Sequence, residues 1–351
     1  MRFLQYIPFL EKKGIAVDVH ALLSDELLAD RYDVGGYTSR ALITSYWDRL
    51  RVLLNKRQYD AVWIEKEALP WWPSWLERFL LAGKPYILDY DDAVFHGYDL
   101  HPSRLVRQLM GRRLDRLMSG ANLVIGGNDY LAKRARVAGA NAVEVIPTVI
   151  DINRYHPYNC GSSAGMAIEK VLKIVWIGSA STTKYLEVLR EPLQKLSKEK
   201  PFILRVIGAG HINLPGVEIE AIPWRETTEV KYIGECDIGI MPLLDSPWER
   251  GKCGYKLIQY MACSLPVVAS DVGVNSQIVI QGKSGYLARS PADWVAALEA
   301  LLDDETLRRN MGQVGRKRVE DLYCVQVTSG QMAHLLQVAA GRAIDLCAKD
   351  S

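Results

Sequence analysis

Short apolar runs alternate with amphipathic segments along most of the chain, a pattern typical of strands and helices that follow one another in a parallel sheet. In the first half we predict strands at 15–22, 61–64, 86–90, 122–125 and 143–146, and helices at 4–13, 39–54, 72–82, 103–118 and 130–137. In the second half we predict strands at 171–177, 202–207, 217–221, 238–241, 266–269 and 285–288, with helices after Pro291. The pattern predicts an α/β fold of two Rossmann-like domains with a cleft between them.

A stretch rich in Gly, Ser and Pro at 157–165 has the composition of an interdomain linker. We therefore expect one domain at 1–156, a second at 166–330 and a final helix at 331–351.

Composition narrows the class of protein. A chain of 351 residues can bury two substantial cores. Its net charge of +2 gives no reason to expect a nucleic-acid partner. The six cysteines show no Cys-x-x-Cys spacing, so we expect neither a metal site nor a disulfide framework, and a reducing cytoplasm suits them. We find no signal peptide and no apolar run of the roughly 18 residues that a membrane span needs.

The segment 246–273 contains the strongest chemical signal in the sequence. A loop opened by Gly251 and Gly254 leads into an amphipathic helix and then a buried strand. The first amides of such a helix lack intrahelical partners, and its dipole adds partial positive charge, so a phosphate can bind there. Lys252 and Lys256 add full charges, and the segment predicts a phosphate site. The alternative is that Gly251 and Gly254 serve only loop geometry and that Lys252 is a solvated surface charge.

Tyr260-Met261-Ala262 and Leu265-Pro266-Val267-Val268-Ala269 in this segment resemble the donor-nucleotide segment of GT-B glycosyltransferases, in particular the retaining family 4. Further segments resemble the same family in order and spacing: 59–70, 88–96, 127–132, 146–151, 176–182 and 236–243. The resemblance implies a transferase that moves a sugar from a nucleotide diphosphate sugar, its co-substrate, to a saccharide or lipid-linked saccharide, without a cofactor or a divalent metal. It also implies that 1–156 is the acceptor side, that 166–330 binds the donor and that 331–351 packs back on the first domain.

The start of the chain departs from the family pattern, because similar proteins carry a strand and loop before the Gln5-Tyr6 helix. We expect the N-terminal domain to lack this first strand, either through truncation of the chain, which we favour, or through a different sheet.

The resemblance also implies a set of donor-binding residues: Gly178, Ser179, Lys184, Gly251, Lys252, Cys253, Gly254, Lys256 and Gln259. Two of these positions depart from the family. Ser179 stands at the place of an arginine that holds the diphosphate, and Gln259 stands at the place of a glutamate that contacts the ribose. A first glutamate, which contacts the donor sugar, falls at Gly251, and Glu249 could replace it if the loop bulges.

Asp91, Asp92 and His96 follow the apolar run 86–88, so we expect them at the carboxyl end of a strand. Together with Glu249 they are our candidate catalytic residues: carboxylates can orient acceptor hydroxyls or act as a base, and the histidine can contact the donor sugar. The alternative for Asp91 or Asp92 is a cap on the following turn. Asp89 is assigned to the strand.

The segment 103–118 carries five arginines against one aspartate, together with an apolar stripe at helical spacing. It predicts either a basic face that contacts anionic lipids, or an ordinary helix with solvated arginines. We expect a cytoplasmic protein with peripheral contact to the inner face of the membrane. Two rival functions stay open, a nucleotide-sugar epimerase of GT-B shape and a catalytically weak nucleotide-sugar-binding protein.

Overall fold

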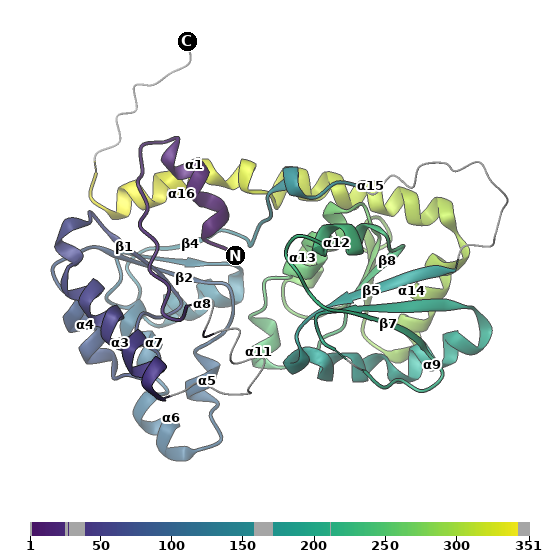
Figure 1. Ribbon diagram of the computed structural model, residues 1–351, viewed down its shortest axis with the longest axis horizontal. Helices are drawn as coiled ribbons and strands as arrows, with labels where there is room; N and C mark the ends of the chain where they lie inside the picture. Colours follow the sequence, from purple (N-terminus) through teal and green to yellow (C-terminus); the bar gives the residue numbers. More distant parts are fainter. Residues whose placement is uncertain (1, 25–26, 28–38, 158–170, 211, 343–351) are drawn as a thin grey trace, which may run out of the picture. The chain divides into compact units, whose positions relative to one another are not determined.

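The computed structural model describes residues 2–24, 27, 39–157, 171–210 and 212–342 (Figure 1). The chain divides into two compact units, Met1–Pro147 with Ser329–Ser351, and Thr148–Thr328. Each unit is built on a parallel sheet with helices, which confirms the predicted fold class. Nearly all of the linker predicted at 157–165 lies outside the described residues.

The sheet of the first unit contains four parallel strands in the order β1-β2-β3-β4. Every residue of β2 and β3 is buried, as expected for strands of a parallel sheet that are covered on both faces. The strands are β1 (Val62–Glu65), β2 (Tyr86–Tyr90), β3 (Leu123–Gly126) and β4 (Val143–Val145).

The helices of the first unit surround this sheet, and α8 is capped by the Asn128 side chain, which accepts a hydrogen bond from the Leu131 amide. They are η1 (Leu4–Tyr6), α1 (Ile7–Glu11), α3 (Ser39–Leu54), η2 (Lys56–Gln58), α4 (Ser74–Leu81), α5 (His96–Asp99), α6 (Arg104–Met110), α7 (Arg113–Met118) and α8 (Asp129–Val137).

The sheet of the second unit has the strand order β7-β6-β5-β8-β9-β10, all parallel. In chain order this is 3-2-1-4-5-6, the doubly wound arrangement of dinucleotide-binding domains. The strands are β5 (Leu172–Ile177), β6 (Phe202–Ile207), β7 (Glu218–Ile222), β8 (Ile238–Met241), β9 (Val267–Ser270) and β10 (Gly285–Ala288).

Two apolar clusters cover the faces of this sheet, one around Tyr260 and Met261 of α12 and the other around Trp176 and Trp294. The helices of this unit are η3 (Ile152–Arg154), η4 (Ala180–Leu189), α9 (Arg190–Glu199), α10 (Glu229–Gly234), α11 (Pro247–Arg250), α12 (Tyr255–Ala262), α13 (Asn275–Ile278), α14 (Pro291–Asp303) and α15 (Glu305–Leu322). The last helix, α16 (Val325–Ala339), consists mostly of residues that group with the first unit.

The boundaries between the units differ from those read from composition. Residues 148–156 group with the second unit, because Ile150 pairs with Cys324 and Tyr155 is buried in that unit's core. The residues from Ser329 onward group with the first unit, where Arg342 forms an ion pair with Asp60.

Two predicted elements are wrong. Residues 15–22 form no strand, and their side chains are exposed or half-buried. The predicted helix 103–118 is interrupted at Gly111 and Arg112, so that α6 and α7 are separate. The interruption turns Arg113 inward, where it forms buried ion pairs with Glu67 and Glu77. Arg113 is therefore not part of a basic outer face.

Candidate functional site

The strand order of the second unit changes direction between β5 and β8, since β6 and β7 lie on one side of β5 and the later strands on the other. Ligands of open α/β sheets bind at the carboxyl ends of the strands at such a point. Gly178 and Ser179 follow β5 directly, and residues 242–254 lead from β8 to α12. The topology thus brings the two predicted donor-binding segments to one edge of the sheet.

The loop before α12 has a shape that requires glycine at its end. Gly254 has φ +67°, and a Cβ atom there would lie 2.2 Å from Cδ1 of Ile278. Gly251 and Cys253 are buried, with the Cys253 Sγ atom 3.9 Å from the Gly251 carbonyl oxygen. The start of α12, with its outward amides and positive dipole end, is therefore held in one position.

Three lysines gather around two aromatic rings beside this loop. The Nζ atoms of Lys184 and Lys252 lie 5.2 Å and 5.9 Å from the centre of the Tyr185 ring. The Nζ atom of Lys256 lies 4.5 Å from the centre of the Trp176 ring. We call Lys184, Lys252 and Lys256 the lysine cluster. Aromatic faces attract ammonium groups, so the rings hold these charges near one another without neutralising them.

Lys256 of the lysine cluster has a lowered pKa. Burial and the neighbouring charge of Lys252 lower its pKa from 10.5 to about 7. Among the residues that the structure places, no carboxylate forms an ion pair with its Nζ atom. A bound anion would offset both effects, so this geometry is suited to a phosphate group.

Glu249 binds Tyr185, the residue whose ring lies beside Lys184 and Lys252. Its Oε1 atom accepts a hydrogen bond of 2.6 Å from the Tyr185 hydroxyl, and Ser246 donates to its Oε2 atom. Burial alone would raise the pKa of this carboxyl, but the two hydrogen bonds and the charge of Lys184 outweigh burial and lower it. Both oxygens of Glu249 thus bind protein groups, which suits a residue that fixes the Tyr185 ring.

Gln259 lies on α12 with its side chain buried. Its Nε2 atom donates hydrogen bonds to Oε1 of Glu229, at 2.6 Å, and to the hydroxyl of Tyr155, at 2.9 Å. The Tyr155 hydroxyl also donates to Glu229, at 2.9 Å. The nitrogen end of the Gln259 amide is therefore held by Glu229 and Tyr155.

The turn after β5 is tightly packed. The Gly178 amide donates to the Ile207 carbonyl, and an added Cβ at Gly178 would lie 2.4 Å from the Trp176 ring. The Ser179 hydroxyl lies 2.9 Å from the hydroxyl of Ser181. Ser179 therefore brings a small neutral group to the place where the family resemblance expects an arginine.

In the first unit, Asp91 and Asp92 follow β2 as predicted. Asp91 forms an ion pair of 3.0 Å with Lys66, which follows β1 and has a positive φ of 63°. The Oδ1 atom of Asp92 accepts a hydrogen bond from the amide of the next residue, Ala93. Asp89 is buried within the strand, where burial raises its pKa to about 6 although Arg2 pairs with it.

His96 is buried in a polar network. Its Nδ1 atom lies 2.7 Å from Asp99, and its Nε2 atom lies 2.8 Å from the Tyr130 hydroxyl. Asp99 in turn pairs with Arg134. Both ring nitrogens thus bind groups of the first unit, an arrangement that suits a residue supporting the loop after β2.

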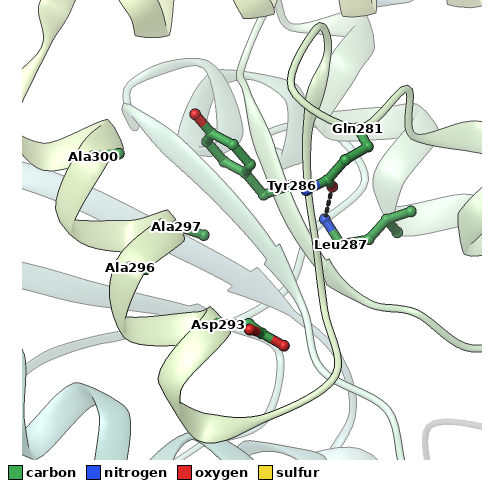
Figure 2. A pocket seen from close by; sticks show the side chains of 7 residues that line it. All are labelled: Gln281, Tyr286, Leu287, Asp293, Ala296, Ala297 and Ala300. Atoms are coloured by element: carbon green, nitrogen blue, oxygen red, sulfur yellow. Dashed lines mark hydrogen bonds between the residues drawn. The ribbon is translucent and has the colours of Figure 1, made fainter.

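A cavity of about 230 Å³ lies elsewhere in the second unit, between β10 and α14 (Figure 2). Gln281 and Asp293 line it, but Oε1 of Gln281 accepts from the Leu287 amide and Asp293 caps α14. Small-molecule pockets are usually about 300–1,000 Å³. The cavity contains none of the predicted site residues and is too small for a nucleotide sugar.

No motif in the sequence pointed to several polar residues that lie near the predicted sites. Glu229 resembles an ordinary acidic residue in a first helical turn, and Tyr155 falls at the end of the expected first domain, just before the linker expected at 157–165. Lys66 lies within the segment 59–70, whose pattern assigns it no role of its own. No group of three or more His, Cys, Asp or Glu side chains suited to a metal ion occurs in the described ranges.

Comparison with known proteins agrees with the geometry of the second unit. Residues 172–304 match the family described as Glycosyl transferases group 1. A D-inositol 3-phosphate glycosyltransferase from Pseudarthrobacter chlorophenolicus is 30% identical over 131 residues, which are 37% of this chain and 30% of that protein. This chain matches only 19% to 30% of the length of the first three such curated relatives.

Solved structures share the fold over most of the chain. A glycosyltransferase from Rickettsia africae ESF-5 has a TM-score of 0.66 at 12% identity, covering 97% of this chain and 94% of that one. HepE from Anabaena, solved with UDP-glucose, has a TM-score of 0.64 at 15% identity, covering 94% and 88%. Residues 172–304 thus belong to the glycosyl transferases group 1, and the chain has the fold of the GT-B glycosyltransferases.

Proposed function

We propose that the protein transfers a sugar from a nucleotide diphosphate sugar to a saccharide or lipid-linked saccharide acceptor, with retention of configuration. The single observation that carries the proposal is Lys256, a partly buried ammonium group beside Lys252 at the start of α12. The family match covers this segment, and the fold is shared with HepE, which was solved with UDP-glucose.

Transfer breaks the bond between the anomeric carbon and the diphosphate, and forms a bond from that carbon to an acceptor hydroxyl oxygen. The departing diphosphate keeps the bonding electrons. In our proposal the lysine cluster and the first amides of α12 stabilise this negative charge, so no divalent metal takes part. Gly178, Ser179, Gly251, Cys253 and Gly254 shape the donor site.

In the same proposal the acceptor is bound by the first unit. Asp91 and Asp92 orient the acceptor hydroxyl, and one of the two carboxylates receives its proton. The ion pair with Lys66 holds Asp91 in place. Glu249 and His96 act by positioning Tyr185 and the loop after β2. This assignment follows the hydrogen bonds already made by each side chain.

The test is incubation of the protein with UDP-, GDP- and ADP-sugars, with and without saccharide acceptors. A glycosyltransferase releases nucleoside diphosphate in proportion to added acceptor. Isomerisation of the donor without acceptor would instead identify an epimerase, and saturable binding without turnover would identify a binding protein. Either of those results overturns the proposal.

We further propose that the first unit contacts an anionic membrane surface, from which a lipid-linked acceptor could be reached. Three of its helices each carry two exposed apolar side chains four residues apart, hence on one helix face. These pairs are Ile43 and Trp47 on α3, Trp75 and Phe79 on α4, and Leu105 and Leu109 on α6.

Helix α6 buries none of its residues, and Arg104 and Arg107 are exposed on it. Apolar pairs beside arginines suit the interface of an anionic bilayer. In the described part of the chain, no helix is long and apolar enough to cross a membrane.

Sedimentation with vesicles tests this contact. We expect binding to vesicles of phosphatidylglycerol and phosphatidylcholine that is lost in a Trp75→Ser/Phe79→Ser variant. Val137→Ser, which changes an exposed valine on α8, is the matched control and should bind like the wild type. Equal sedimentation of all three proteins would refute the membrane contact.

A further inference from the structure

We propose that Glu229 is a positioning residue for nucleotide binding: it fixes the amide of Gln259 so that the carbonyl oxygen of Gln259 accepts a hydrogen bond from a ribose hydroxyl. The inference rests on the proposed function, because it concerns the same donor site. It adds a residue that neither the family resemblance nor the sequence pattern indicated.

The contacts of Glu229 leave little freedom to either side chain. Its Oε1 atom accepts from Gln259 Nε2 and from the Tyr155 hydroxyl, and its Oε2 atom accepts from the Trp224 indole. Glu229 is 5% exposed and Gln259 is 2% exposed. A buried carboxylate with three donors keeps one geometry, since every rearrangement would leave a donor unpaired.

The chemistry of an amide then determines which way Gln259 faces. An ionised carboxylate can only accept hydrogen bonds, whereas an amide has a donor end and an acceptor end. With Glu229 on one side, the donor end must point toward it, and the carbonyl oxygen is directed away. The hydrogen bonds of the Gln259 side chain to described residues are those of its Nε2 atom, and none of these residues donates to its carbonyl oxygen. An acceptor aimed away from Glu229 matches a hydroxyl donor.

The same contact accounts for glutamine at a place where the family resemblance expects glutamate. A glutamate at 259 would bring two carboxylates to about the 2.6 Å that now separates the amide nitrogen from Glu229. Two buried carboxylates at such a separation cannot both ionise. The negative charge expected on α12 is therefore found on α10, and position 259 carries the neutral partner.

Gln259 lies where a ribose would follow a diphosphate bound at the lysine cluster. It is three residues after Lys256 on α12, so the two side chains are neighbours on the helix surface. The next residue, Tyr260, accepts a hydrogen bond from the Ile177 amide, which directly precedes Gly178. On the other side, a Cβ atom added at Gly208 would lie 3.1 Å from Cβ of Trp224, the indole partner of Glu229.

The experiment compares ribonucleoside and 2′- or 3′-deoxyribonucleoside diphosphates by calorimetric titration of UDP, GDP and ADP with their deoxy forms. We expect the wild type to prefer the ribose form of the bound nucleotide by at least about tenfold, or roughly 1.4 kcal/mol. In Glu229→Gln the amide of Gln259 loses its fixed orientation, so the preference should fall to within about twofold. Binding of pyrophosphate should stay unchanged.

Two further variants separate positioning from general damage. The exchange Glu229→Gln/Gln259→Glu retains one carboxylate and one amide in the pair, and it should regain most of the ribose preference. Glu226→Gln alters a carboxylate of the same segment that pairs instead with Arg154, and it should behave like the wild type. If Glu229→Gln folds poorly, the exchange variant alone decides, since a positioning role requires it to discriminate between the two sugars.

The outcomes are distinguishable. If no nucleoside diphosphate binds the wild type, the proposed function fails and this inference fails with it. If nucleotides bind and Glu229→Gln keeps the full ribose preference, or the exchange variant has none, only the role of Glu229 is refuted.

Discussion

Removing the charges of Lys252 and Lys256 together is the most direct perturbation of the proposed donor site. The two ammonium groups are close enough that the charge of Lys252 helps to lower the pKa of Lys256. The variant Lys252→Ala/Lys256→Ala leaves the backbone of the glycine loop in place. It therefore removes charge while retaining the amides and the helix dipole.

The expected effect can be worked from these contacts. A hydrogen bond to a charged group contributes about 1.5–3 kcal/mol. Desolvation of Lys256 lowers what its charge can contribute near pH 7, and salt screens the partly exposed Lys252. We therefore expect a loss of at least about 1.4 kcal/mol, which is a tenfold weaker affinity.

The assay is calorimetric titration with the nucleoside diphosphate that binds the wild type, at pH 6.5 and low salt. Lys195→Ala/Lys198→Ala is a matched control, because it removes two exposed lysines of α9 in the same unit. The control should bind like the wild type, which excludes a general effect of net charge.

An affinity of the Lys252→Ala/Lys256→Ala variant within about twofold of the wild type would refute the reasoning. The diphosphate would then bind elsewhere, and the lysine cluster would be a surface feature. Equal weakening in the control would point instead to long-range attraction between the protein and the anion.

Three other outcomes are expected. Bound diphosphate favours the charged form of Lys256 and so raises its pKa from about 7. Above pH 7, binding therefore takes up a proton. The affinity for the diphosphate, measured in a pH series, should fall by up to about tenfold per pH unit as the pH rises from 7. A flat profile from pH 6 to 9 would contradict this. Sugar transfer should persist near its untreated rate in excess chelator, because lysines and helix amides neutralise the leaving group; complete loss in EDTA that Mg²⁺ or Mn²⁺ restores would promote Asp89, Asp91 and Asp92 to candidate metal ligands. Finally, Arg113→Met should destabilise the protein by about 3–5 kcal/mol in denaturant unfolding, because it leaves two buried carboxylates unpaired, and a change below about 1 kcal/mol would show that they are compensated.

Local patterns of the sequence were sufficient for most of the fold. The apolar runs at 86–88 and 238–241 are strands because a parallel sheet buries both faces of its strands, so each run reads as continuous. The glycines around Lys252 indicated the loop before α12, since Gly254 adopts a backbone conformation that other residues rarely adopt.

The same patterns misled where a segment depends on a distant partner. Residues 15–22 have the apolar content of a strand, but a strand forms only when a neighbour offers hydrogen bonds, and this segment pairs with none of the described strands. The helix expected at 103–118 has the right periodicity throughout. It is interrupted at Gly111 and Arg112, and Arg113 pairs with Glu67 and Glu77, which precede it by 46 and 36 residues.

The sequence by itself thus determined the alternation of strands and helices and the loop suited to phosphate, because these depend on neighbours a few residues apart. Only the tertiary structure decided which polar groups meet. The doubly wound order places the ends of β5, β7 and β8 along one edge, and that order brings Glu229 to Gln259 and the aromatic rings to the lysine cluster. Hydrogen bonds and charges act over a few ångströms in space, whatever the separation along the chain, so the partners of Gln259 and Lys256 became visible only in the folded protein.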